Sequence, residues 1–203
     1  MYMPPGFRQD DLEALHKLMQ DYSFATMVTQ HQGTPFATHL PFVLAPDEGP
    51  YGTLYGHMAR ANPQWQDFDA NPEVLVIFQG PHTYIAPSWY EVELSVPTWN
   101  YAVVHAYGSP RLITECGALC TMLDTLVRTY EAQFPKPWLF QLPDDYVRKM
   151  VQGIVGFALP ISRIEGKFKM SQNRSTTDQK RVATTLAASG DPMHAAVAEL
   201  MNS

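Results

Sequence analysis

Apolar residues recur every three or four positions in several separate segments of the chain. The first such segment follows two acidic residues and predicts an amphipathic helix over 10–22. The same spacing predicts helices over 114–134, over 143–154, and over 175–202 with an interruption near Gly190 and Pro192. A short helix is also expected within ARANPQWQDF, where Asn62 is a candidate N-cap.

Between these helices the pattern changes to alternation and to short apolar runs rich in β-branched and aromatic residues, which is typical of strands. Strands are expected over 24–30, 35–45, 52–58, 73–80, 82–87, 99–113 and 155–170. Most of them are joined by short turns such as HQGT, which favours an antiparallel barrel over a parallel sheet. The pattern therefore predicts one domain over 1–203, mainly β with peripheral α-helices, including C-terminal helices from about 175 to 203.

The composition fits a chain that buries a core. Hydrophobic residues make up 45% of the 203 residues and charged residues 17%. The formal charge of -6 argues against a broad nucleic-acid surface, because phosphate binding needs clustered lysine and arginine. No apolar run reaches the roughly 18–20 residues of a membrane helix, and the N-terminus lacks the pattern of a signal peptide. A cytoplasmic location without membrane contact is expected.

The most informative stretch for chemistry is GHMARANPQW, where a strand end, a polar turn and a helix start follow one another. Main-chain N–H groups at a helix start attract anions, and the guanidinium of Arg60 is a fork suited to phosphate. An ordinary capped turn with a surface arginine is the alternative interpretation. In both cases Arg60 is expected to contribute little to folding.

Two further segments carry polar side chains where partners are needed. Thr38 and His39 lie within a predicted strand and could bond the edge of a planar ring, or a neighbouring backbone group. KFKMSQNRS places several donors directly after a strand, where they could hold a phosphate, a flavin pyrimidine edge or a nucleic-acid backbone, or form a solvated basic loop.

Familiar catalytic and nucleotide signatures are missing from the sequence. It contains no GxGxxG after a strand, no P-loop, no GxSxG elbow and no HExxH. The seven histidines lack metal-ligand spacing, and no carboxylate pair stands out for acid–base work. The sequence therefore displays no recognisable catalytic machinery.

Taken together and in order, MYMPPGF, ATHLPF, GHMARANPQW, PSWY, VPTWNYAVVHAYG and KFKMSQNR resemble the PaiB-type family of FMN-binding negative transcriptional regulators. The resemblance runs from Met1 to about Arg181. It implies a split β-barrel of the pyridoxamine-phosphate-oxidase type, in which two subunits of a homodimer build two FMN sites at their interface. The chain is therefore expected to bind FMN as a homodimer.

The resemblance also assigns site residues. The GHMARAN segment would contact the phosphate through Arg60, Asn62 and nearby main chain. The ring of the flavin would lie along the ATHLPF strand. A further group after the last strand would close the site, with the donating subunit left open. The resulting set of cofactor-binding residues is Thr38, His39, Leu40, Gly56, His57, Met58, Arg60, Asn62, Lys169, Ser171, Gln172 and Asn173.

Three functions stay open on this resemblance. The first is a flavin-binding regulator or sensor, because the family is known for negative regulation of sporulation and protease genes. The second is an FMN-dependent oxidoreductase acting on a small molecule, and the third is a haem-binding or haem-degrading barrel. Fold cannot choose among them, because function belongs to the site. The candidates for a surface facing DNA or a regulatory partner are Lys167, Lys169, Arg174, Lys180 and Arg181.

Overall fold

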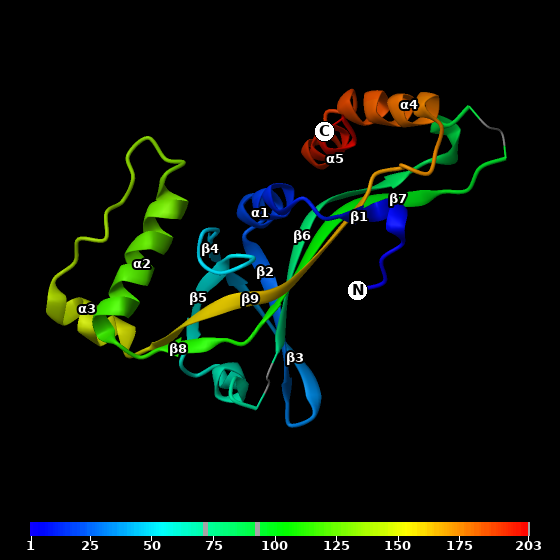
Figure 1. The fold of residues 1–203 in the computed structure, drawn as a ribbon. Coiled ribbons are helices and arrows are strands. Elements are labelled where there is room, and N and C mark those ends of the chain that lie inside the picture. The colour runs from blue at the N-terminus through cyan, green and yellow to red at the C-terminus, as the bar shows by residue number, and fades with distance from the viewer. Residues whose placement is uncertain (71–72, 92–93, 203) are drawn as a thin grey trace. The chain divides into compact units, whose positions relative to one another are not determined.

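The fold is built on antiparallel strands, with helices between them and after the last strand (Figure 1). The computed structural model describes residues 1–70, 73–91 and 94–202. The strands are β1 (Arg8–Gln9), β2 (Phe24–His31), β3 (Thr34–Pro41), β4 (Val43–Ala45), β5 (Thr53–Ala59), β6 (Val74–Ile85), β7 (Thr98–Gly108), β8 (Arg111–Ile113) and β9 (Ile154–Lys169). The α-helices are α1 (Leu12–Asp21), α2 (Cys116–Glu131), α3 (Asp144–Val151), α4 (Thr176–Ala187) and α5 (Pro192–Asn202). Three short 3₁₀ turns are η1 (Pro5–Phe7), η2 (Pro63–Asp67) and η3 (Pro87–Trp89).

Within the described residues the strands form one nine-stranded sheet in the order β3-β2-β6-β7-β9-β5-β4, and β1 and β8 also pair with β9. The pairs β2–β3, β2–β6, β4–β5 and β5–β9 are all antiparallel. The prediction of an antiparallel sheet accompanied by helices is confirmed. No helix in the described part of the chain is long and apolar enough to cross a membrane.

The chain divides into two compact units, each built from separated stretches of sequence. Unit 1 contains 1–18, 79–104 and 165–203, and unit 2 contains 19–78 and 105–164. Strands β6, β7 and β9 have residues in both units.

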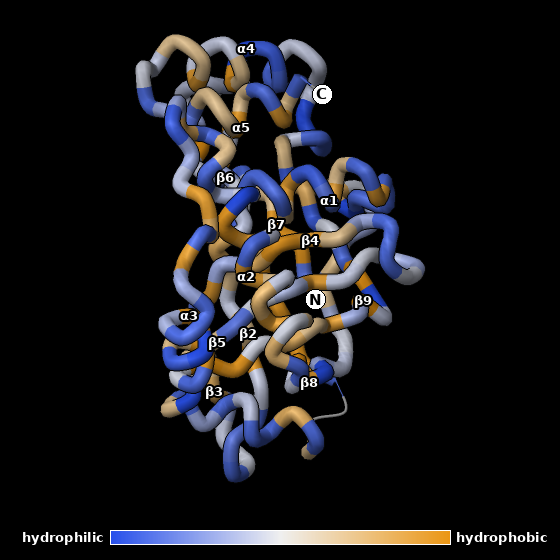
Figure 2. The backbone as a smooth tube through the Cα atoms, turned by 90° about the vertical axis from the view of Figure 1, so that its left-hand side faces the viewer, coloured by the Kyte–Doolittle hydropathy of each residue, from blue (hydrophilic) through white to orange (hydrophobic). Residues whose placement is uncertain are grey.

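Unit 2 is organised around aromatic rings. The ring of Phe42 meets those of Phe78 and Phe157 edge-on, with centroids 6.0 and 6.1 Å apart, and Phe68 packs on Phe157 in the same way. Figure 2 shows hydrophobic and hydrophilic residues mixed along the chain. Buried and more exposed positions alternate along most of β2 and along β5 from Leu54 to Ala59. Alternation of this kind buries one face of a strand, and it places the even-numbered residues of β5 in this aromatic core.

Unit 1 has an aliphatic core. Helices α4 and α5 contribute Val182, Leu186 and Val197, all of them fully buried. The N-terminal part of α1 adds Leu15 and Leu18, which confirms the predicted amphipathic character of that helix.

Three strand predictions are wrong in detail. The expected strand 99–113 is split into β7 and β8 at Ser109 and Pro110. The segments 73–80 and 82–87 were expected as separate strands, but β6 runs through both without a break. Gly80 serves close packing there, because a Cβ at this position would lie 2.9 Å from Leu18 Cδ1 and 3.1 Å from the Ala102 carbonyl oxygen. The expected strand 35–45 is instead split into β3 and β4 at Phe42, whose side chain enters the core.

Candidate functional site

The segment that leaves β5 is fixed by the side chain of Asn62. Its Oδ1 accepts the main-chain N–H of Gln64 at 3.0 Å, which confirms Asn62 as the N-cap of η2. Its Nδ2 donates to Thr38 Oγ1 at 3.0 Å. Two residues predicted for the site from different segments, Thr38 on β3 and Asn62 before η2, are therefore in direct contact.

Arg60 is held at the end of β5 by main-chain oxygens. Its Nε donates to the Gln152 carbonyl and its Nη2 to the Ile154 carbonyl, both at 2.8 Å. The indole N–H of Trp65 donates to the carbonyl of Arg60 at 3.0 Å. The expectation that Arg60 contributes little to folding does not fit these contacts, because its guanidinium ties β5 to the start of β9. The fork has five N–H donors in all, so donors are left for a ligand.

His57 carries the most unusual polar atom of this segment. Its Nδ1 is buried and has no hydrogen-bond partner among the described residues. Burial also lowers the pKa of His57, so the neutral imidazole is favoured. A buried polar atom of this kind costs free energy unless something bonds to it.

Three predicted site residues lie in the core of unit 2. Leu40 and Met58 are buried hydrophobic residues. Gly56 lies opposite Phe42 and Phe157, where a Cβ would come within 3.1 Å of the Phe157 ring. Any contact that these three residues make with a ligand would therefore come from their main chain.

His39 lies on the exposed side of β3. Its Nδ1 is 3.0 Å from Thr26 Oγ1 on the neighbouring strand, and its ring is stacked near that of Phe24 with centroids 6.4 Å apart. The bond that His39 makes is to a side chain on β2, whereas the alternative interpretation from sequence expected a neighbouring backbone group.

Gln64 supports this segment and was missed by sequence reasoning. It is fully buried, and its Nε2 lies 3.2 Å from both the Met27 carbonyl and Thr29 Oγ1 on β2, and 3.3 Å from the Phe36 carbonyl on β3. Its Oε1 has no partner among the described residues. A glutamine directly after a capping Asn-Pro pair was the available signal, but its burial depends on strands distant in sequence.

The remaining predicted residues belong to unit 1, beginning with Lys169 at the end of β9. Its Nζ donates to Thr98 Oγ1 and, at 2.9 Å, to the Trp99 carbonyl. Burial, followed by the charge of Lys167, lowers the pKa of Lys169, while Tyr101 acts in the opposite direction.

The turn after Lys169 is internally bonded. Ser171 is buried, has a backbone φ of 64°, and donates to Asn100 Oδ1 at 3.1 Å. Gln172 accepts from the main-chain N–H of Met170 at 2.7 Å and donates to the Phe168 carbonyl at 2.6 Å. Asn173 is exposed. The basic-loop alternative therefore does not describe this turn well, because Gln172 bonds back to the preceding main chain and the buried Ser171 bonds to Asn100 on β7.

The basic residues considered for a DNA-facing surface differ in accessibility. Lys167 is buried and donates to the Tyr2 carbonyl at 3.2 Å. Arg174 lies over the ring of Tyr90, 4.2 Å from its centroid, and Arg181 pairs with Glu91 at 3.5 Å. Lys180 is exposed.

Comparison with known proteins establishes the class. Residues 1–163 match the family described as "Putative FMN-binding domain". The chain belongs to this PaiB-type FMN-binding family. The family assignment confirms both the resemblance seen in the motifs and the prediction of FMN as cofactor.

Individual relatives match along nearly the whole chain. The "Protease synthase and sporulation protein PAI 2" of Bacillus subtilis is 40% identical over 202 residues, which is 99% of this chain and 96% of the relative. An uncharacterized protein of Emericella nidulans is 30% identical over 90% of this chain and 88% of its own length.

Solved structures share the fold at low identity. The FAD and heme binding protein from Mycobacterium smegmatis has a TM-score of 0.65 at 16% identity, covering 85% of this chain and 78% of that one. The flavocytochrome Anf3 from Azotobacter vinelandii has a TM-score of 0.61 at 17% identity, covering 80% and 69%. The predicted split-barrel fold class is confirmed.

The residues of unit 2 fit a flavin nucleotide in their chemistry. A phosphate needs N–H donors, and Arg60 retains donors beyond its two main-chain bonds. A flavin ring edge offers both donors and acceptors, which suits a neutral imidazole whose buried Nδ1 lacks a partner, as in His57. Residues that would hold the cofactor are thus present on and beside β5.

Proposed function

We propose that this chain is a flavin-dependent regulator that works as a homodimer, with FMN held by the segment from Gly56 to Asn62 and by the strand at Thr38, His39 and Leu40. Lys169, Ser171, Gln172 and Asn173 are proposed to complete the site. The observation that carries the proposal is the buried, unpartnered Nδ1 of His57.

Each group has a defined task in this proposal. Arg60 donates to the phosphate, and its main-chain bonds hold the guanidinium in one orientation, so that little side-chain freedom is lost on binding. Asn62 keeps η2 and Thr38 in register through its two bonds. The bound FMN would supply a ring that accepts or releases electrons.

The regulatory role rests on the relative from Bacillus subtilis. Its name states a part in protease synthesis and sporulation, and the match covers 96% of its length. The match thus covers nearly the full length of both chains, and this likeness supports a regulatory role for this chain.

Titration with FMN, followed by quenching of its fluorescence, tests the cofactor site. Binding in the micromolar range or tighter is expected, and no quenching at about 100 µM FMN would contradict it, since that corresponds to less than about 5.5 kcal/mol of binding free energy. The absorbance of the purified protein separates flavin from haem. Turnover of NAD(P)H by the flavin-loaded protein would favour an oxidoreductase over a regulator.

Light scattering tests the homodimer. A twofold assembly is expected because strand edges and apolar faces of such a barrel need cover. A monomer near 22.9 kDa at micromolar concentration would contradict this part of the proposal.

A further inference from the structure

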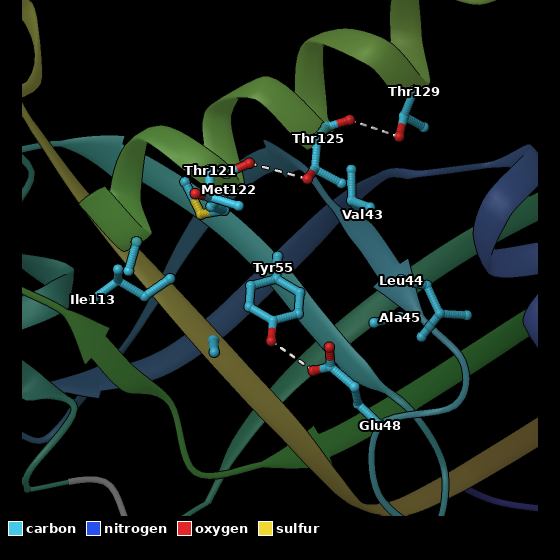
Figure 3. A pocket seen from close by; sticks show the side chains of 12 residues that line it. Val43, Leu44, Ala45, Glu48, Tyr55, Ile113, Thr121, Met122, Thr125 and Thr129 are labelled. Atoms are coloured by element: carbon cyan, nitrogen blue, oxygen red, sulfur yellow. Dashed lines mark hydrogen bonds between the residues drawn. The ribbon is translucent and has the colours of Figure 1, made fainter. Parts of the chain in front are cut away.

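Unit 2 contains a cavity of about 750 Å³ that uses none of the residues proposed to hold FMN (Figure 3). Strand β4 and helix α2 supply much of its apolar wall, including Val43, Leu44 and Met122. Pockets that bind small molecules span about 300–1,000 Å³ and are mostly apolar, so the size and lining are those of a ligand site.

The hydroxyl groups that line this cavity already donate their protons in hydrogen bonds within the protein. The hydroxyl of Tyr55 donates to Glu48 Oε2 at 2.6 Å, and Figure 3 shows the pair. Along α2 the threonines Thr121, Thr125 and Thr129 donate to the carbonyl four residues earlier, at 2.9 to 3.0 Å. What these groups still offer to a ligand is oxygen atoms that accept hydrogen bonds.

The charge of the cavity is negative. Glu48 carries it, and the described residues that line the cavity include no lysine, arginine or histidine. A phosphate group would meet a carboxylate without a counter-charge, so the cavity does not suit FMN. Acceptors and one carboxylate beside an apolar wall suit a molecule that brings donors and a positive charge.

We propose that this cavity binds an apolar amine, whose hydrocarbon or aromatic body lies against β4 and α2 and whose ammonium group donates to Glu48. Glu48 is exposed, so the ammonium group lies at the mouth, where it keeps part of its hydration. The contribution of charge is correspondingly modest, and the apolar wall supplies most of the affinity.

A displacement experiment on the full chain tests the proposal. The environment-sensitive dye N-phenyl-1-naphthylamine reports occupancy, and two competitors of the same size but opposite charge, 4-phenylbutylamine and 4-phenylbutanoate, are compared at neutral pH. The amine is expected to displace the dye at a concentration roughly tenfold lower than the carboxylate, from attraction in one case and repulsion in the other. Equal potency of the two competitors would overturn the proposal.

Matched variants locate the effect. Glu48→Gln keeps the size of the side chain and is expected to abolish the preference for the amine, while Glu199→Gln, at an exposed carboxylate of unit 1, keeps it. Thr125→Trp fills the cavity and should weaken dye binding at least tenfold. Thr185→Trp changes an exposed helical threonine with the same kind of bond to the preceding turn, and should have no such effect. Dye binding unaffected by Thr125→Trp would overturn the proposal.

Saturation with FMN separates this cavity from the flavin site. The dye is expected to bind equally well with and without FMN, because the two sites share no residue. Competitive loss of the dye on addition of FMN would mean that the cavity belongs to the flavin site, and would also overturn the proposal. Loss of FMN binding in a variant such as His57→Gln, with the dye still bound, would affect only the function proposed above.

Discussion

Unit 2 contributes to the predicted flavin site a buried imidazole nitrogen without a partner, whereas unit 1 contributes side chains whose polar atoms are mostly bonded within the unit. Among the predicted site residues of unit 2 this atom is Nδ1 of His57, with spare donors on Arg60 close by in sequence. In unit 1 Lys169, Ser171 and Gln172 all bond to neighbouring groups. Under the proposed function, unit 2 would supply the specific contacts to FMN and unit 1 a turn of fixed shape.

If this contrast is right, substitutions in the unit 1 turn should act first on stability, and substitutions around β5 should act first on flavin affinity. The largest effect on stability is expected for Ser171→Ala. The change removes a bond between two buried groups and leaves Asn100 Oδ1 unsatisfied, at a cost of about 1–3 kcal/mol in the free energy of unfolding. Denaturant unfolding measures it.

Ser171→Gly is the matched control for this prediction. This variant loses the same hydrogen bond as the alanine variant. The backbone φ of 64° costs a residue with a Cβ roughly 1 kcal/mol, and glycine does not pay this cost. The glycine variant should therefore be more stable than the alanine variant. Alanine and glycine variants as stable as the parent would show that the turn is not held by this bond.

The next effect is on affinity, through Arg60→Ala. Loss of a charge-assisted contact to the phosphate costs about 1.5–3 kcal/mol, which is a tenfold or greater fall in FMN affinity at about 1.4 kcal/mol per decade. Riboflavin, which lacks the phosphate, should bind the variant and the parent almost equally. Calorimetric titration with both ligands makes the comparison.

Because Arg60 also donates to two main-chain carbonyls, Arg60→Ala is expected to lower the stability of the fold. This effect must be separated from the loss of the phosphate contact. Arg148→Ala, at an exposed arginine of unit 2 that pairs only locally with Asp145 at 2.8 Å, is the control for a lost surface charge. An equal loss of affinity for FMN and riboflavin in Arg60→Ala would assign the residue to folding alone.

A smaller effect is expected from pH, through His57. Burial lowers the pKa of His57 below the ordinary 6.5, so the unfolded chain binds this proton more readily than the folded one. Its contribution to stability is complete above about pH 6.5 and is lost as the pH falls through the lowered value. The parent should therefore lose more stability than His57→Gln between about pH 7.5 and about pH 5.

Thermal unfolding across that range gives the comparison for His57. His39→Gln, at an exposed histidine of the same unit, should follow the parent. Because FMN is proposed to bond to Nδ1 of His57, it should bind the His57→Gln variant more weakly than the parent at every pH. This result would link the effect of acid to the flavin site. Parallel acid losses in the parent and in His57→Gln would contradict the role of burial.

The smallest effect concerns Tyr55, two residues before His57. The hydrogen bond to Glu48, with burial and the carboxylate charge, raises the pKa of Tyr55 to about 12. The stability from this bond is therefore complete below pH 10 and is lost as the pH rises through about 12. Tyr55→Phe should cost at most about 1 kcal/mol at pH 8, because the pair is largely exposed, and its unfolding should converge with that of the parent at alkaline pH.

Local patterns in the sequence predicted a large part of the fold. Helical spacing identified all five α-helices of the described residues, and the Asn-Pro pair marked Asn62 as a cap. These features depend on neighbours within a few residues, where propensity and capping chemistry act. Motif order from Met1 to about Arg181 identified the family, because several individually weak segments coincide.

What only the tertiary structure decided depends on contacts between distant residues. Gly80 stands inside one long strand instead of at a turn, since Leu18 and Ala102 approach it. Arg60 is bound to the carbonyls of Gln152 and Ile154, more than 90 residues away in the chain. The cavity beside Glu48 exists because α2 lies across strands whose own patterns give no sign of an empty space. Sequence periodicity records which face of an element is buried, but it does not record which element covers that face or how completely the covering side chains fill the gap.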